Sequence, residues 1–215
     1  MALISNAKGR SENDTPSGYE RLFGNKELGI LVSRVQSAVI SMGNELESIL
    51  ADKLTDKDGI AICKVNKENR IFKKAKNGKD IQVDCVVEKD NKYLLIEIKD
   101  GDTFDTKKVA GEVESLEAAK QCLINEKSII PEKITLYYCS FNAASHEQII
   151  KGTKNLLNDI KPLTGKELCA ILGLNYKKIV KEREKDQKDN LDYFVDQLAK
   201  IPEIHQMFLD NSQEA

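Results

Sequence analysis

The sequence contains no long apolar run and no segment that resembles a leader peptide. No stretch of its 215 residues approaches the roughly 20 consecutive apolar residues that a membrane-spanning helix requires. Residues 1–19 are polar and lack the apolar core of a secretory signal peptide. These absences argue against a helical membrane protein, and we expect a cytoplasmic protein.

Clustered cysteines and several catalytic motifs are also absent. The five cysteines are widely spaced and form no CxxC pair, so we expect neither a disulfide framework nor a zinc site. The sequence has no glycine-rich phosphate loop, no GxSxG elbow and no Cys/His nucleophile arrangement. A large excess of one charge is missing too, because the formal net charge is only -2. This balance argues against a general nucleic-acid coat protein.

The sequence does contain a regular succession of predicted helices and strands. Apolar residues recur at helical spacing in two long segments, and apolar runs or alternation predict four strands. Turn residues at 88–92 predict an antiparallel hairpin between the second and third strands. The succession predicts an α/β fold in which helices flank a mixed central sheet. We expect helices at 26–54, 105–126 and from Ser145 to about 160, and strands at 60–65, 81–87, 93–99 and 134–141.

Residues 1–161 and 162–215 differ in character, and we expect them to form separate parts. The first part contains the N-terminal arm, the long helix and all four predicted strands. The second part contains helix patterns, and its first helix is predicted to begin at a capping box of Thr164 and Glu167 and to end at Gly173. We therefore expect a helical C-terminal region.

The C-terminal region also contains a pattern similar to a helix-turn-helix. Residues 164–174 would form the first helix and the turn, and the following helix would present polar and basic side chains to a DNA groove. An ordinary helical hairpin with a glycine between its helices has the same pattern, so both interpretations stay open. The side chains that would contact DNA are Asn175, Tyr176, Lys177, Lys178 and Lys181.

Three charged residues lie within the two predicted strands of the hairpin, where charge is unusual. Glu97 and Lys99 alternate with Ile96 and Ile98, so they share one face of their strand. Asp84 can join them if the hairpin register allows it, for which a bulge or splay near Asp84 could be needed. Two carboxylates and a lysine can hold a hard divalent metal ion and stabilise charge on a phosphate. A salt bridge on a solvated sheet surface is the simpler alternative.

These residues resemble the motif of a known nuclease superfamily. Val83-Asp84, twelve residues and then Glu97-Ile98-Lys99 are similar to the PD-(D/E)xK motif, with Val83 in place of the proline. The resemblance is most like a type II restriction endonuclease, and it implies magnesium-dependent hydrolysis of double-stranded DNA at a short specific sequence. Asp84, Glu97 and the Ile98 carbonyl would bind Mg²⁺. Lys99 would orient or activate the attacking water and stabilise charge on the phosphate.

The resemblance implies further site residues. Gly43 to Glu47 resembles a GxxxE segment whose glutamate faces the metal, which makes Glu47 a third acidic residue of the site, with Glu45 as its rival. Asp80 is the rival of Asp84. Basic residues near the site are predicted to contact DNA phosphates, although simple solvent exposure would also explain them. These residues are Lys73, Lys74, Lys107 and Lys108.

The resemblance also implies partners. We expect a homodimer that matches a two-fold DNA site, and a cognate DNA methyltransferase that acts on the same site without necessarily binding this protein. Two other functions stay open. A structure-specific or repair nuclease, such as a junction resolvase, would share the fold. A non-catalytic DNA-binding protein would use the C-terminal region, but the intact set of Asp84, Glu97 and Lys99 argues against it.

Overall fold

The computed structural model forms two compact units. The sheet unit comprises residues 46–178, and the helical unit comprises residues 1–45 and 179–215. The sequence predicts a division at residue 162 instead. No helix in the part of the chain that the structure describes is long and apolar enough to cross a membrane. The described residues are 3–8, 16–54, 59–62, 71–73, 80–101 and 104–213.

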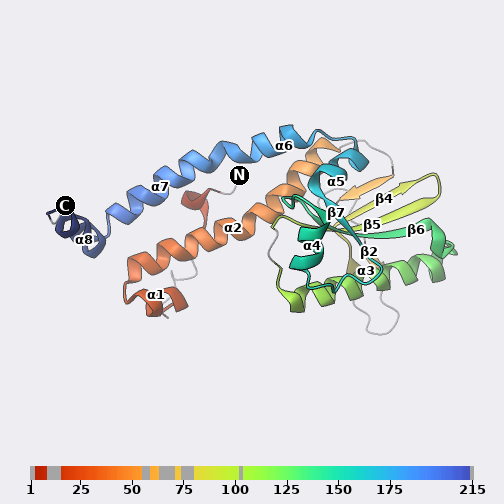
Figure 1. Ribbon diagram of the computed structural model, residues 1–215, viewed down its shortest axis with the longest axis horizontal. Coiled ribbons are helices and arrows are strands. Elements are labelled where there is room, and N and C mark those ends of the chain that lie inside the picture. The colour runs from red at the N-terminus through yellow and green to blue at the C-terminus, as the bar shows by residue number, and fades with distance from the viewer. Residues whose placement is uncertain are drawn as a thin grey trace. The chain divides into compact units, whose positions relative to one another are not determined.

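The sheet unit is built on a five-stranded mixed sheet with the strand order β1-β4-β5-β6-β7 (Figure 1). The first three of these strands are antiparallel neighbours, and the last two run parallel to β5. This architecture confirms the predicted fold class. Residues 63–65 of the first predicted strand lie outside the described residues. The bounds are β1 (Ile60–Ile62), β4 (Cys85–Lys89), β5 (Lys92–Lys99), β6 (Ile134–Ser140) and β7 (Lys161–Thr164).

β4 and β5 form the antiparallel hairpin that the turn residues predict. Asp90 and Asn91 have φ angles of 51° and 57°, and two successive positive φ angles are typical of a two-residue type I′ turn. Asp and Asn adopt this left-handed conformation more readily than most residues. The register pairs Cys85 with Ile96, and this pairing sets the end of β4 beside the second half of β5.

The single strand predicted over 81–87 is wrong, because the chain leaves the sheet at residues 83–84. β3 (Asp80–Gln82) pairs instead with β2 (Ile71–Lys73) in a separate two-stranded sheet, and β4 begins directly after the interruption. The alternation that predicted the strand is still present, because Ile81, Val83 and Cys85 are all buried. The interruption supplies the splay near Asp84 that the sequence analysis considers.

α3 (Thr106–Lys127) packs against the sheet and confirms the predicted helix over 105–126. The Asp105 carboxylate caps its N-terminus by accepting a hydrogen bond from the backbone N–H of Lys107 at 3.0 Å. Fully burying a large apolar side chain contributes roughly 1.5–3 kcal/mol. The α3 residues that enter the main apolar cluster are Val109, Val113, Leu116, Ala119 and Leu123, which join Leu95, Leu136 and Tyr138 from the sheet.

α5 (Gly165–Leu172) packs against β6 and β7, and it begins and ends as the sequence predicts. Thr164 and Glu167 form the capping box, and Gly173 ends the helix in the left-handed conformation with φ 68°. Gly165 is required for a different reason. A Cβ atom there would collide with the backbone carbonyl of Phe141, so only glycine allows this close approach.

The helix predicted from Ser145 to about 160 is too long. α4 (His146–Gly152) begins at the predicted cap, where the Ser145 hydroxyl accepts a hydrogen bond from a backbone N–H, but it has only 7 residues. Lys154, Asn155 and Asn158 have positive φ angles, which a right-handed helix cannot contain. The chain therefore turns after α4 and returns to the sheet as β7.

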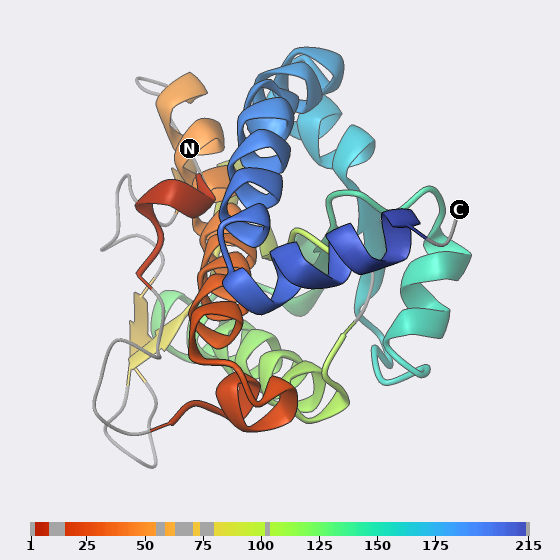
Figure 2. The same ribbon diagram turned by 90° about the vertical axis from the view of Figure 1, so that its left-hand side faces the viewer.

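The helical unit contains the first part of α2 (Lys26–Lys53), which confirms the long predicted helix. α2 and α7 run side by side in two perpendicular views (Figures 1 and 2). An Arg34 guanidinium nitrogen donates a hydrogen bond to the Tyr193 hydroxyl at 2.8 Å between them. α8 is a helix that the sequence analysis does not predict. The remaining bounds are α1 (Gly18–Phe23), α6 (Tyr176–Arg183), α7 (Gln187–Ala199) and α8 (Pro202–Gln213).

Candidate active site

Asp84 lies where β3 and β4 separate, and its side chain is tied to β5. One carboxylate oxygen, Oδ2, accepts a hydrogen bond from the backbone N–H of Ile98 at 2.9 Å. The β4–β5 ladder ends at the pair of Cys85 and Ile96, so this side-chain bond continues the connection between the two segments. The Asp84 carboxylate is therefore held beside the stretch of β5 that carries Glu97 and Lys99.

Glu97 and Lys99 point to the same face of β5, as the alternation predicts. The Lys99 ammonium nitrogen, Nζ, lies 2.6 Å from Oε1 of Glu97. The Glu97 side chain is only 10% exposed, whereas that of Lys99 is 29% exposed. A buried carboxylate with one cationic partner is unlike a solvated surface salt bridge, so the simpler alternative does not describe this pair.

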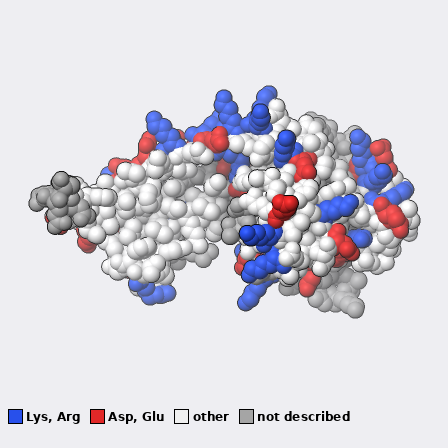
Figure 3. Space-filling view, in the orientation of Figure 1, with Lys and Arg blue, Asp and Glu red and all other residues white. Residues whose placement is uncertain are grey.

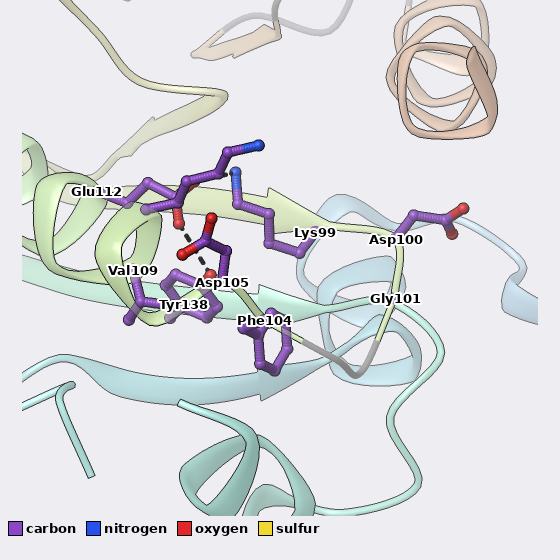
Figure 4. Close-up of a pocket in the computed structure, with 9 residues that line it drawn as sticks. Lys99, Asp100, Gly101, Phe104, Asp105, Val109, Glu112 and Tyr138 are labelled. Carbon is purple, nitrogen blue, oxygen red and sulfur yellow. Dashed lines mark hydrogen bonds and ion pairs between the residues drawn. The ribbon is translucent and has the colours of Figure 1, made fainter. Parts of the chain in front are cut away.

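Two residues that the sequence analysis missed join this group. Oε1 of Glu112 on α3 lies 2.8 Å from Nζ of Lys99, and its other oxygen accepts a hydrogen bond from the Tyr138 hydroxyl at 2.9 Å (Figure 4). The sequence contains a signal for Glu112, because it lies between the core residues Val109 and Val113 on the apolar side of α3. Together these residues form the active-site cluster, which comprises Asp84, Glu97, Lys99, Glu112 and Tyr138.

Burial and neighbouring charge shift the titration of the active-site cluster. Burial, followed by the charge of Asp84, raises the pKa of Glu97 from 4.5 to about 8, against the opposing effect of Lys99. Burial by itself would lower the pKa of Lys99. The charge of Glu97 and hydrogen bonds to Glu112 and Glu97 outweigh burial, so the pKa of Lys99 is raised and its side chain is an ammonium group.

Tyr138 closes the cluster on the β6 side. It is the β6 neighbour of Glu97 in the parallel register. Burial, and then the charge of Glu112 and the hydrogen bond to it, raise the pKa of Tyr138. The phenol therefore stays neutral and donates a hydrogen bond to Glu112. Phe104 packs against the tyrosine ring edge to face, with centroids 5.5 Å apart and planes at 84°.

A pocket of about 370 Å³ opens beside Lys99 and Glu112. Figure 4 shows these two side chains reaching toward each other at its wall, above Phe104 and Tyr138. Lys108, which the sequence analysis predicts to contact DNA, also lines this pocket. The pocket therefore combines two lysines, three carboxylates (Asp100, Asp105 and Glu112) and an aromatic wall.

The donor set of the cluster fits a hard divalent cation. Asp84 and Glu97 offer carboxylate oxygens at one place, and the effect of Asp84 on the pKa of Glu97 shows that their negative charges repel. The cluster contains three carboxylates and only one ammonium group. In the part of the chain that the structure describes, no group of three or more His, Cys, Asp and Glu side chains could hold a metal ion. Mg²⁺ typically binds through one or two carboxylates and keeps several waters.

The other acidic residues from the sequence analysis have different settings. Glu47 is half-buried on α2, next to the fully buried Leu46, and its role as a third acidic residue stays a prediction. Its rival Glu45 belongs to the helical unit. Asp80 is exposed in β3, where its backbone pairs with Lys73 of β2. The hydrogen bond to β5 thus comes from Asp84 and favours it over Asp80.

The predicted DNA-contacting lysines are exposed wherever the structure describes their side chains. Lys107 and Lys108 lie in the first turn of α3. Lys73 lies at the end of β2, and Lys74 lies outside the described residues. Basic side chains are visible over α6 in Figure 3. The exposed lysines of α6 are Lys177, Lys178 and Lys181.

Two predicted DNA-contacting residues of the C-terminal region have structural contacts. The Asn175 side-chain oxygen accepts a hydrogen bond from the backbone N–H of Lys178 at 3.1 Å, which caps the first turn of α6. The Tyr176 ring packs against Phe141 with centroids 5.3 Å apart. α5, the turn at Gly173 and α6 reproduce the predicted pair of helices, a pattern that fits either a helix-turn-helix or an ordinary helical hairpin.

The mixed sheet, its flanking helices and the carboxylate–lysine group at the end of β5 define a restriction-endonuclease-like fold. No family model matches the sequence. The chain is 38% identical over 226 aligned residues to the type II restriction enzyme HhaII of Haemophilus parahaemolyticus, and the alignment covers 96% of this chain and 97% of that protein. The chain therefore belongs to the type II restriction enzymes. As a member of that family it is a site-specific DNA endonuclease.

Proposed function

We propose that this enzyme is a Mg²⁺-dependent member of the PD-(D/E)xK superfamily, and that Asp84, Glu97 and Lys99 are its catalytic residues. The supporting observation is the convergence of these side chains from two segments of the chain. Asp84 accepts a hydrogen bond from Ile98, between the other two residues, and Lys99 contacts Glu97 at 2.6 Å. Their order and spacing in the sequence are those of the superfamily motif.

Asp84, Glu97 and the backbone carbonyl of Ile98 would hold the Mg²⁺ ion, with Glu47 as a further acidic residue of the site. When bound, Mg²⁺ polarises the phosphate and lowers the pKa of a coordinated water. The surplus of carboxylates in the active-site cluster supports this assignment, because a divalent cation would offset the repulsion between Asp84 and Glu97.

Lys99 acts as a cation and hydrogen-bond donor. Its Nζ contacts two carboxylate oxygens at 2.6 and 2.8 Å, as an ammonium group does. An ammonium group has no free lone pair, so Lys99 orients the attacking water and stabilises negative charge on the scissile phosphate, and it does not itself remove the proton. Its proximity to the pocket beside α3 leaves it access to a phosphate oxygen.

The predicted basic and polar residues would contact the DNA backbone. Lys108 lines the pocket beside Lys99, and Lys107 precedes it in the first turn of α3. Lys73 and Lys74 would add further contacts with DNA, as would Asn175, Tyr176, Lys177, Lys178 and Lys181. Contacts of this kind position a duplex but do not read its sequence. The binding that they provide weakens as the salt concentration rises.

The test is digestion of unmethylated phage DNA with and without Mg²⁺, comparing the wild type with Lys99→Ala. We expect discrete bands with the wild type in Mg²⁺, and their loss in EDTA and in the variant. A smear, or cleavage restricted to branched DNA, would contradict the sequence-specific assignment and favour a structure-specific or repair nuclease. Equal cleavage by Lys99→Ala would refute the catalytic role of Lys99. DNA methylated by a cognate methyltransferase should resist cleavage.

We further propose that the enzyme acts as a homodimer. Large apolar side chains are exposed on the helical unit, including Val39 and Ile40 on α2 at 60% and 57%, and Leu191 on α7 at 62%. The surface over α2 in Figure 3 is largely free of charged residues. Apolar surface of this kind often marks a protein contact, and a two-fold dimer matches a palindromic DNA site. Light scattering that gives a monomer with and without DNA would contradict the proposal.

A further inference from the structure

The Lys99 ammonium group lies between two carboxylates from different elements. Glu97 reaches it from the same strand at 2.6 Å, and Glu112 reaches it from α3 at 2.8 Å. The two carboxylates differ in their second contact. Glu97 lies beside Asp84, whereas the second oxygen of Glu112 accepts a hydrogen bond from Tyr138.

Glu97 and Glu112 therefore cannot have the same role. If Glu97 binds the metal, as the proposed function states, its negative charge is shared with a divalent cation and it attracts Lys99 less strongly. The contact from Glu112 does not depend on Glu97. Glu112 would then still compensate the charge of Lys99 and hold the ammonium group beside the reacting phosphate.

Contacts on α3 and β6 keep the Glu112 side chain in place. One oxygen faces Lys99 and the other accepts the Tyr138 hydrogen bond at 2.9 Å. Tyr138 is itself held by its position on β6 and by the edge-to-face contact with Phe104. The side chain of Glu112 is 20% exposed, and the adjacent Val113 is buried in the apolar core. A carboxylate with both oxygens engaged is a defined point of attachment for a flexible lysine.

We propose that Glu112 is a positioning residue that holds Lys99 for catalysis, and that Tyr138 acts through Glu112. This inference rests on the proposed function, because it requires Lys99 to act at the phosphate. It assigns to α3 a part in catalysis that the sequence motif does not include. Glu112 contacts neither metal nor DNA in this assignment.

The first experiment compares Glu112→Gln with Glu114→Gln on the same helix. Glutamine has nearly the size of glutamate and still accepts the Tyr138 hydrogen bond, but it carries no charge for Lys99. Glu114 is exposed, so its variant controls for the loss of one charge on α3. We expect Glu112→Gln to lower the single-turnover rate at saturating DNA by about 10- to 100-fold, as loss of an outer-shell partner typically does. Glu114→Gln should cleave at the wild-type rate.

DNA affinity and metal dependence separate positioning from other roles. We expect DNA affinity, measured with Ca²⁺ in place of Mg²⁺, to be unchanged in Glu112→Gln. The Mg²⁺ concentration that gives half of the maximal rate should also change little. A large increase in that concentration would contradict positioning, and would show that Glu112 is itself a metal ligand.

Double variants test whether the effect passes through Lys99. Tyr138→Phe should lower the rate less than Glu112→Gln does, and the double variant should be no slower than Glu112→Gln alone. Glu112→Gln should likewise have no further effect in a Lys99→Ala background. Effects that multiply in both pairs would show independent structural damage and overturn the inference.

The failure of this inference can be told apart from the failure of the proposed function. If Lys99→Ala and Asp84→Ala cleave normally, the proposed function fails. If those variants are inactive while Glu112→Gln cleaves at the wild-type rate, the catalytic assignment stands and only the positioning role of Glu112 is overturned. Circular dichroism and thermal melting of each variant would establish that the protein tested is folded.

Discussion

Two polar clusters in the sheet unit each pair a glutamate with a basic side chain, and they differ in burial. In the active-site cluster, Lys99 lies 2.6 Å from Glu97, whose side chain is 10% exposed. The second cluster, the cap cluster, is formed by Thr164, Glu167 and His146. There Nε2 of His146 lies 2.8 Å from Glu167, whose side chain is 45% exposed. The local pairing is alike, but the surroundings are not.

The titration of the two glutamates shows what this difference means. Burial and the charge of Asp84 raise the pKa of Glu97, because its carboxylate has too few compensating partners. Burial acts the same way on Glu167, but hydrogen bonds from the Thr164 backbone and hydroxyl, and from His146, lower its pKa overall. The cap cluster therefore stabilises the fold. In the active-site cluster, burial and like charge disfavour the ionised form of Glu97, and perturbed carboxylates of this kind are typical of functional sites.

The same substitution in both clusters gives the largest expected contrast. Glu97→Gln should reduce DNA cleavage by about 100- to 1,000-fold, because it removes a carboxylate from the centre that stabilises the reacting phosphate. Glu167→Gln should cleave at the wild-type rate, because its side chain belongs to a helix cap. Single-turnover digestion at saturating Mg²⁺ compares them, and a similar loss in both variants would contradict the distinction.

The pH dependence of stability in metal-free protein is the second contrast. The pKa of Glu97 is about 8 in the folded protein against a usual 4.5, so the folded state binds the extra proton. Its contribution to stability is complete below about 4.5 and is lost as pH rises through about 8. We expect the unfolding free energy of the wild type, relative to Glu97→Gln, to fall across this range. Urea unfolding in EDTA measures it, and parallel curves would show that Glu97 is not perturbed.

Loss of the capping box is expected to have a smaller effect. Thr164→Ala removes the hydroxyl that accepts a hydrogen bond from the Glu167 backbone N–H, and it should lower the unfolding free energy by about 1 kcal/mol. Lys166→Ala is a suitable control, because Lys166 is exposed on the same helix. Denaturant unfolding should separate the two variants, while both keep wild-type cleavage.

The smallest expected effect is a loss of stability in acid through Glu167. Its pKa is lowered in the folded protein, so its contribution is present above the usual glutamate pKa and is lost as pH falls through the lowered value. The exposure of this side chain keeps the effect small. Unfolding of the wild type and Glu167→Gln should converge as the pH falls, and a difference that grows in acid would contradict the assignment.

Local sequence pattern was sufficient where local geometry decides the outcome. The period of two in β5 predicted that Glu97 and Lys99 share a face, and the Asp–Asn turn predicted the hairpin. The capping box and Gly173 likewise predicted both ends of α5. In each case a few neighbouring residues determine the conformation.

Features that depend on tertiary packing could not be predicted from the local sequence pattern. The split between β3 and β4 arises because β3 pairs with β2, so alternation alone suggested one strand. Glu112 reaches Lys99 only because α3 packs over β5 and β6. The sequence could indicate that Glu112 is an unusual charge on the apolar side of α3, but it could not identify Lys99 as the partner. α4 ends early at residues whose positive φ angles the sequence does not signal strongly.

The active-site cluster contains three carboxylates and one ammonium group, and this imbalance also bears on how the enzyme binds DNA. Phosphates approaching this surplus of negative charge are repelled until a divalent cation is bound, so on the proposed function each ligand should strengthen the binding of the other. Thermodynamic reciprocity requires the two enhancements to be equal. Free magnesium would then govern the residence time on DNA as well as the cleavage rate. The protein would remain bound to a duplex mainly when the metal ion needed for cleavage is also bound.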